Sequence, residues 1–202
     1  GLCLPESLSG LGLGLDHAAV FSELFGEKAF TYMLIDGAFV PSLLLGSCSE
    51  TPQMRRLAED IVTGAPRCAF TWQERAGQID GELPAVTLQR KKLSGTKVFV
   101  PVTNETTDFI IYATQVGTPV IVVVPADQPG LSKTVEHLSD GSSVASLSFA
   151  QTSVEEAWII ARGDNAVGAA RGAIAAATIL KAGQLYGLAR GALNQTIAYL
   201  HS

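Results

Sequence analysis

The segments CAFTWQERAG, residues 68–77, and LSGTKVFVP, residues 93–101, decide how this chain is organised. Both mix β-branched and aromatic residues with a glycine, which is typical of short strands interrupted by a turn. The segments before and after them have the residue spacing of helices. The sequence therefore predicts a β module that lies between two helical parts.

The strand pattern continues through the middle of the chain. Apolar, β-branched runs recur about every 8–12 residues and are separated by turns rich in Gly, Pro, Asn and Asp, which predicts an antiparallel β-barrel or β-sandwich. Residues 121–124, Ile-Val-Val-Val, are apolar on both faces of an extended chain and predict a buried central strand. The expected strands cover residues 66–77, 85–91, 93–100, 108–114, 119–125, 131–136 and 143–149.

The opening third predicts helices. Thr51 followed by Pro52 is a typical start for a helix over residues 52–62. An earlier helix is expected over residues 17–25, capped by Asp16. The helix over residues 52–62 is expected to turn Met54, Leu57, Ala58 and Ile61 inward. The helix over residues 17–25 carries Val20, Phe21 and Leu24 on one face.

The last segment, from about residue 165 to residue 202, predicts one or two long helices crowded with glycine and alanine. Small side chains let helices approach closely, so we expect partner helices. The fold class is therefore α+β. It has a helical N-terminal segment (1–65), an antiparallel β-barrel middle domain (66–163) and the start of an α-helical bundle (164–202).

Composition excludes several classes of function. The net charge of −5 over 202 residues argues against a nucleic-acid surface, which needs clustered Lys and Arg. The one basic run, residues 90–92, is either a solvated turn or a steering element for an anionic ligand. Charged residues interrupt the apolar C-terminal run, so we expect no membrane span.

Cysteine and histidine usage points the same way. The three cysteines have no paired spacing, which favours reduced thiols and a cytoplasmic location. The three histidines lie far apart in sequence, without the spacing of metal ligands. We therefore expect no metal site.

Local motifs spread over nearly the whole chain match one known family. The letters LPE at residues 4–6 and GLG at residues 10–12 are similar to its PEEYGGLG loop. Residues 68–77 are similar to its A-x-x-T-E-P-x-x-G strand, with Glu74 at the position of the Glu, and residues 93–100 to its L-x-G-x-K-x-W-I strand. Further similarities are Asp108 to the following "AD", residues 147–154 to l-x-F-x-x-V-x-V, and residues 183–200 to A-x-x-x-G-x-A-x-x-A-L-x-x-x-x-x-Y-A-x-x-R.

Taken in order, these motifs resemble the acyl-CoA dehydrogenase family. The resemblance implies an FAD-dependent enzyme that desaturates an acyl-CoA thioester at its α,β-bond, with FAD between the β domain and the helical bundle. A Glu of the bundle takes the α-proton while the β-hydrogen leaves as hydride to flavin N5. The implied partners are acyl-CoA, an electron-transfer flavoprotein or similar acceptor, and either identical subunits (a dimer or tetramer) or a paralogous subunit.

The resemblance also assigns site residues, although this chain departs from the family at several of them. Gln73 stands where the family has Thr, Arg75 where it has Pro, and Pro101 where it has a Thr or Ser whose hydroxyl reaches N5. An alternative alignment puts Thr103 and Asn104 in the place of that Thr. The expected cofactor-binding residues are Phe70, Trp72, Gln73, Phe99, Val100, Pro101 and Thr103, and the expected substrate-binding residues are Gly77 and Gln78.

No catalytic residue is expected within residues 1–202, because the family's base lies further along the chain. Glu74 is more simply a structural ion-pair or capping carboxylate than a base. We expect this piece alone neither to dehydrogenate acyl-CoA nor to retain FAD tightly. Two other hypotheses remain open, namely a non-catalytic subunit that partners an active paralogue, and a flavin-free interaction module with an exposed small-residue helix.

Overall fold

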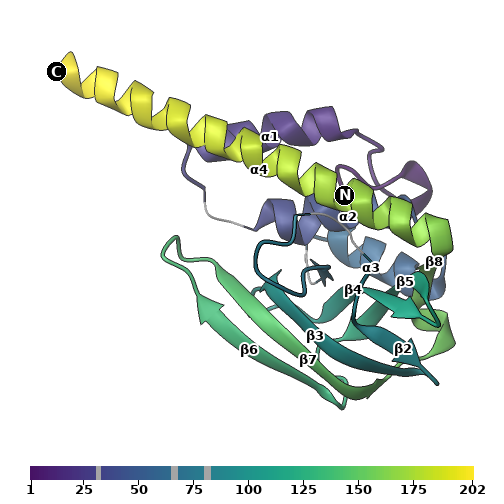
Figure 1. The fold of residues 1–202 in the computed structure, drawn as a ribbon. Coiled ribbons are helices and arrows are strands. Elements are labelled where there is room, and N and C mark those ends of the chain that lie inside the picture. Colours follow the sequence, from purple (N-terminus) through teal and green to yellow (C-terminus); the bar gives the residue numbers. More distant parts are fainter. Residues whose placement is uncertain (31–32, 65–67, 80–82) are drawn as a thin grey trace.

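The computed structural model describes residues 1–30, 33–64, 68–79 and 83–202 (Figure 1). Its longer helices are α1 (Leu15–Glu27), α2 (Val40–Leu45), α3 (Pro52–Val62) and α4 (Gly163–Leu200). The short helices are η1 (Glu6–Leu8), η2 (Ile35–Phe39) and η3 (Glu156–Trp158). The strands are β1 (Cys68–Thr71), β2 (Thr87–Gln89), β3 (Lys92–Pro101), β4 (Asp108–Gln115), β5 (Thr118–Pro125), β6 (Leu131–His137), β7 (Ser143–Ser153) and β8 (Ile159–Arg162).

The strands form one sheet that stays open, so the predicted barrel is wrong. Their order is β6-β7-β3-β2-β4-β5-β8, and β1 pairs with β4 off this path. The prediction of a purely antiparallel sheet is also wrong, because β1 and β2 both pair with β4 in parallel. One edge strand, β6, is exposed and polar over most of its length, and the other, β8, has four residues and leads directly into α4. Neither edge has the apolar length that closure of a barrel would bury.

The centre of the sheet is the β4–β5 hairpin, which is buried on both faces. Residues 121–124 are fully buried, which confirms the predicted central strand. One face of the hairpin, with Ile110 and Ile121, packs against the helices, and the other face, with Ile111 and Val122, packs against β3 and β7. The sheet therefore bends so that β3 and β7 cover the inner face of β4 and β5.

The predicted helix over residues 52–62 is confirmed in α3. The Thr51 hydroxyl accepts a hydrogen bond from the Met54 N–H at 3.1 Å. The four residues predicted to face inward are buried, namely Met54, Leu57, Ala58 and Ile61. Arg90 and Lys91 of the basic run lie exposed in the turn between β2 and β3, which agrees with the solvated turn that was one of its two interpretations.

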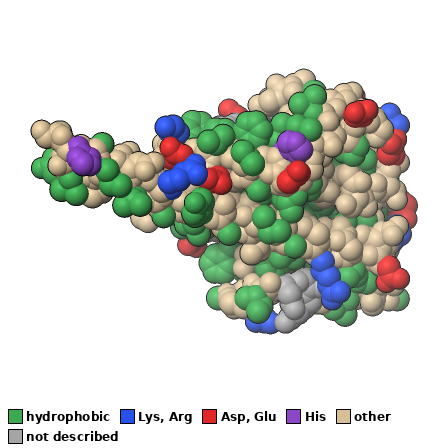
Figure 2. Space-filling model, turned by 90° about the horizontal axis from the view of Figure 1, so that it is seen from above, with side chains coloured by type: hydrophobic (Ala, Val, Ile, Leu, Met, Phe, Trp, Pro, Cys, Tyr) green, Lys and Arg blue, Asp and Glu red, His purple; other side chains and the backbone are tan. Residues whose placement is uncertain are grey.

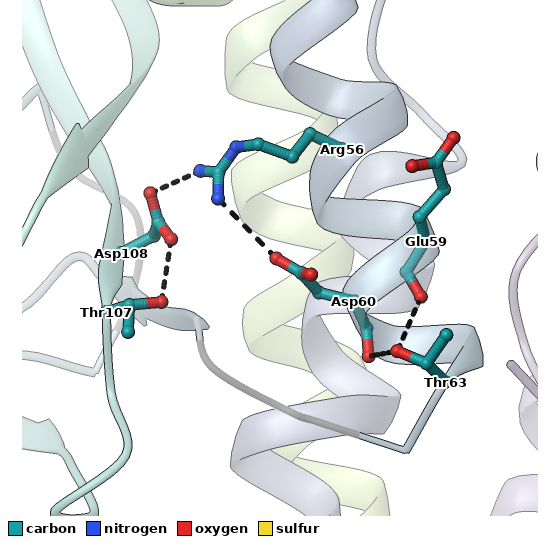
Figure 3. Close-up of polar contacts among 6 residues, drawn as sticks. All are labelled: Arg56, Glu59, Asp60, Thr63, Thr107 and Asp108. Atoms are coloured by element: carbon teal, nitrogen blue, oxygen red, sulfur yellow. Dashed lines mark hydrogen bonds and ion pairs between the residues drawn. The ribbon is translucent and has the colours of Figure 1, made fainter.

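An ion pair ties α3 to the start of β4 (Figure 3). The Arg56 guanidinium lies 2.5 Å from Asp108 and 3.5 Å from Asp60. The Thr107 hydroxyl donates to the second Asp108 oxygen at 2.9 Å. Because the Asp108 side chain is almost fully buried, its charge needs these partners. Asp108, which matches the family's "AD", therefore anchors a helix to the sheet.

Helix α1 differs from its prediction at both its start and its buried face. It begins at Leu15, after Gly14, and Asp16 lies in its first turn instead of capping it. The predicted apolar face, Val20, Phe21 and Leu24, is exposed, whereas the small residues Ala18, Ser22 and Gly26 are buried.

The reason lies in the glycines of α4, against which α1 packs. A Cβ on Gly187 would lie 1.9 Å from the Glu23 carbonyl oxygen, and a Cβ on Gly26 would lie 2.0 Å from that of Gln184. The two backbones approach so closely that only small residues fit between them. Arg190 adds ion pairs to Glu23 and Glu27. The expected partner helix for the small residues of α4 is thus partly supplied by α1.

Helix α4 is one continuous helix of 38 residues. Its first half lies over the helix-covered face of the sheet, and its C-terminal end projects beyond the rest of the molecule (Figures 1 and 2). No helix in the described part of the chain has both the length and the apolar character to cross a membrane. The second half exposes several large apolar residues, namely Leu185, Tyr186, Leu188, Leu193, Ile197, Tyr199 and Leu200.

Candidate functional site

Strand β3 is irregular within the motif of residues 93–101. Its pairing with β7 shifts register between Lys97 and Val100, so Val98 and Phe99 are skipped. Phe99 has a φ of +53°, in the left-handed region that non-glycine residues rarely occupy. The Val98 N–H turns instead to the Gln73 carbonyl oxygen, at 2.9 Å. Bulges and strained backbone of this kind are common beside functional sites.

A cleft of about 130 Å³ opens at this irregularity, between the sheet and α4. Its α4 wall is made of Ala173, Ile174 and Ala177, and Asp36 of η2 closes one side. The sheet wall contains six of the seven residues predicted to bind a cofactor, namely Phe70, Trp72, Gln73, Phe99, Val100 and Pro101. Residues from the two separate motifs, 68–77 and 93–101, thus meet at one place.

The other three predicted site residues lie apart from the cleft. Thr103 lines a neighbouring hollow of about 330 Å³, which shares Pro101 with the cleft, and its hydroxyl accepts from the Glu105 N–H at 3.2 Å. Gly77 lies in an exposed turn with a φ of +73°. Gln78 is buried, and its side-chain oxygen accepts from the Glu74 N–H at 2.8 Å.

An ion pair between Glu74 and Lys97 adjoins the cleft wall at Trp72. The Lys97 side chain is fully buried, and its Nζ is 2.8 Å from Glu74 Oε1 and 3.2 Å from the Trp72 carbonyl oxygen. Glu74 also accepts from the N–H groups of Ala85 and Val86, at 2.7 and 2.9 Å. The expectation that Glu74 is a structural ion-pair carboxylate is confirmed.

The pKa values of both residues are lowered, for different reasons. Burial lowers the pKa of Lys97 to about 8, and the nearby Glu74 carboxylate opposes this shift. Burial alone would raise the pKa of Glu74, but Lys97 and the two N–H donors outweigh it and lower the pKa. The partner of Glu74 was missed in the sequence. The available signal was that Lys97 lies four residues after Leu93, so that both point to the inner face of a strand.

A second charged pair lies where the cleft meets two further hollows. Asp36 of η2 and Lys181 of α4 are 2.6 Å apart. Hollows of about 410 and 450 Å³ adjoin here, both lined by Lys181 and Leu185 of α4. Sequence reasoning gave no signal for this contact, because the two residues are separated by 145 positions.

The described residues form neither a metal site nor a site with a reactive thiol. Within the described residues, no three or more His, Cys, Asp and Glu side chains are grouped as metal ligands. Cys3, Cys48 and Cys68 are free thiols, and burial raises the pKa of Cys68 to about 12. A thiol with such a pKa is a poor nucleophile near neutral pH.

Comparison with known proteins gives a consistent family likeness in structure. No family model matches the chain, and no curated protein matches it in sequence. Among solved structures, the steroid ACAD (acyl-CoA dehydrogenase) Tcur3481-Tcur3483 matches 99% of this chain with a TM-score of 0.82 and 27% identity. Butyryl-CoA dehydrogenase from Megasphaera elsdenii matches 98% with a TM-score of 0.80 and 17% identity. PigA, solved with FAD and proline, matches 98% with a TM-score of 0.78 and 18% identity.

This chain spans about half of each of these proteins, covering 54%, 57% and 56% of their lengths. The two matches below 25% identity establish likeness of fold. They agree in fold with the resemblance that the motifs at residues 68–77 and 93–100 carry. The chain has the fold of the acyl-CoA dehydrogenases, the family that its motifs resemble.

Proposed function

We propose that this chain forms the flavin-binding β module and adjoining helices of an FAD-dependent acyl-CoA dehydrogenase. The observation that carries the proposal is the cleft at the β3 bulge, where six residues expected at a flavin surround one space. In this proposal residues 1–65, 66–163 and 164–202 are the helical, β and bundle-forming segments of a larger cytoplasmic oligomer.

The groups around the cleft suit a flat aromatic ring. Trp72 and Phe99 offer aromatic surface, and the short side chains of Ala173 and Ala177 leave room beside α4. Pro101 offers no N–H, so hydrogen bonds to ring heteroatoms would come from the Gln73 amide and the backbone at the bulge.

The size of the cleft limits what this chain holds alone. A volume of about 130 Å³ is well below the roughly 300–1,000 Å³ typical of ligand pockets. The hollows of about 330 and 410 Å³ both share Pro101 with the cleft and extend it. The chain would therefore hold part of the cofactor, and weak retention of FAD by this chain alone follows.

In this proposal the described residues bind and orient, and the proton chemistry lies elsewhere. FAD, when bound, supplies the hydride acceptor. The one carboxylate among the described lining residues of the cleft is Asp36, and Lys181 neutralises it at 2.6 Å. A general base needs a free, desolvated carboxylate. The base would therefore come from another part of the assembly, as would contacts to an electron-transfer flavoprotein, whereas Gly77 and Gln78 of this chain would contact acyl-CoA.

A second candidate function is a non-catalytic subunit that partners an active paralogue. It is favoured by three departures from the family pattern at or beside the cleft, namely Gln73, Arg75 and Pro101. In that case the cleft would be structural, and the exposed apolar half of α4 would meet the partner.

Titration with FAD separates the two candidates. In a Trp158→Phe background Trp72 is the single tryptophan, so its fluorescence reports on the cleft. The dehydrogenase proposal expects saturable quenching of Trp72 by FAD, and weaker quenching after Phe99→Ala. Acyl-CoA would then bleach the flavin absorbance of the full assembly under anaerobic conditions. Absence of saturable quenching up to millimolar FAD contradicts a flavin-binding cleft and favours the subunit hypothesis.

A further inference from the structure

The Lys97 ammonium joins parts of the chain that are far apart in sequence, next to the cleft wall at Trp72. It donates to the carbonyl oxygen of Trp72 and to the carboxylate of Glu74, at 3.2 and 2.8 Å. Trp72 itself lines the cleft. A residue buried inside the sheet thus fixes the backbone of the cleft wall.

The hydrogen bonds continue from Glu74 in two directions. Its carboxylate accepts from Ala85 and Val86, which lead into β2. Its own N–H donates to the side-chain oxygen of Gln78, and the backbone carbonyl oxygen of Gln78 accepts from the Gln73 side-chain amide at 3.3 Å. One charged pair therefore holds the cleft wall, the entry to β2 and the turn at Gln78 in a fixed arrangement.

Stability alone is a poor reason for such a pair. Replacing a buried ion pair by well-packed apolar residues of similar volume is often neutral or stabilising, because two charges lose their hydration. The Lys97 side chain is fully buried, and this burial lowers the pKa of Lys97. Apolar residues do not supply direction, whereas the hydrogen bonds of Lys97 fix the orientation of the Trp72 carbonyl and of the Glu74 carboxylate.

We propose that Lys97 is a positioning residue, which acts through Glu74 and the Trp72 carbonyl to hold the cleft wall at residues 72–74 against the β3 bulge. The expected consequence for FAD affinity rests on the proposed function. The order of the wall itself does not rest on it, because it is a property of the protein without ligand.

The test combines amide hydrogen exchange with FAD titration. The main variant is Lys97→Met with Glu74→Gln, which removes both charges and leaves one side-chain oxygen, enough for one of the two N–H groups of Ala85 and Val86. Glu74→Gln alone is the second variant, for use if the double variant does not fold. Lys92→Met is the matched control, because Lys92 lies on the same strand and bonds the Ser153 hydroxyl, outside the lining of the cleft.

We expect the double variant to unfold cooperatively, with exchange of the amides at residues 72–74 and at Val98 accelerated about 10-fold or more, and with β4 and β5 unchanged. The FAD dissociation constant should rise at least about 10-fold, equivalent to roughly 1.4 kcal/mol. Lys92→Met should change neither readout.

Unchanged exchange at residues 72–74 and Val98 in a folded variant would overturn the positioning role. Faster exchange spread evenly over the chain would also overturn it, because it would mark a purely structural contribution. If the wild-type chain binds no FAD but the local exchange still accelerates, the proposed function fails and the positioning role stands.

Discussion

The β4–β5 hairpin and the bulged strand β3 belong to one sheet but differ in the regularity of their pairing and in the residues that they bury. The hairpin pairs without interruption from Asp108–Pro125 to Gln115–Thr118, and its centre is buried on both faces. Strand β3 shifts register twice against β7, exposes about half of Phe99 and buries the charge of Lys97. Regular pairing supplies stability, whereas the interruption of pairing opens the cleft. The candidate site therefore lies where regular hydrogen bonding between the strands is interrupted.

The largest expected effect is on the hairpin. Ile121→Ala removes a fully buried side chain from the middle of β5 and should lower the free energy of unfolding by about 2–5 kcal/mol. Urea denaturation measures this loss. The control is Val116→Ala in the exposed turn of the same hairpin, which should change stability by less than about 0.5 kcal/mol. Equal effects of the two substitutions would mean that the buried centre of the hairpin contributes no more to stability than its exposed turn.

The second effect concerns pH and the buried lysine. Because the folded pKa of Lys97 is about 8 and the ordinary value for a lysine is 10.5, the unfolded chain holds more protons between these values. The free-energy cost of burying the charged lysine is fully present below pH 8 and disappears as the pH rises towards 10.5. The free energy of unfolding should therefore rise by up to about 3 kcal/mol across this window. Denaturation of the wild type and of the double variant of Lys97 and Glu74 across this window measures the difference. A difference that falls with pH would contradict the assignment.

The smallest effect should separate stability from binding at the bulge. Phe99→Gly relieves the positive φ, worth roughly 1–2 kcal/mol, but adds freedom to the unfolded chain, worth about 0.5–1 kcal/mol. The net change in stability should stay within about 1 kcal/mol. Loss of the aromatic ring should weaken FAD binding about 10-fold. A large loss of stability would mean that Phe99 belongs to the core and not to a ligand site.

Local sequence rules predicted the elements whose partners lie close in sequence. The cap at Thr51, the inward face of α3 and the buried run at residues 121–124 all follow from short-range pattern and are confirmed. The six cleft residues were named from two family motifs. Their convergence was not predictable from spacing alone, because it depends on the pairing of β1 with β4 and on the bulge in β3.

Predictions failed where distant backbone contacts decide the outcome. Periodicity correctly gives a helix near residues 17–25, but it favoured the large apolar face of α1, and the glycines of α4 select the small one. Barrel closure failed because the short β8 and the polar β6 do not pair. The pair of Asp36 with Lys181 joins residues too far apart for any spacing rule. The strand period marks Lys97 as facing inward but does not identify Glu74 as its partner.

The most direct test of the flavin cleft is a titration of this chain with FAD followed by backbone amide chemical shifts. Weak binding is still visible in such a titration, so the small volume of the cleft is no obstacle. The account predicts saturable shifts at Trp72, Gln73, Phe99 and Val100, with the β4–β5 amides unaffected. Shifts confined to other regions, or no shifts at millimolar FAD, would contradict it.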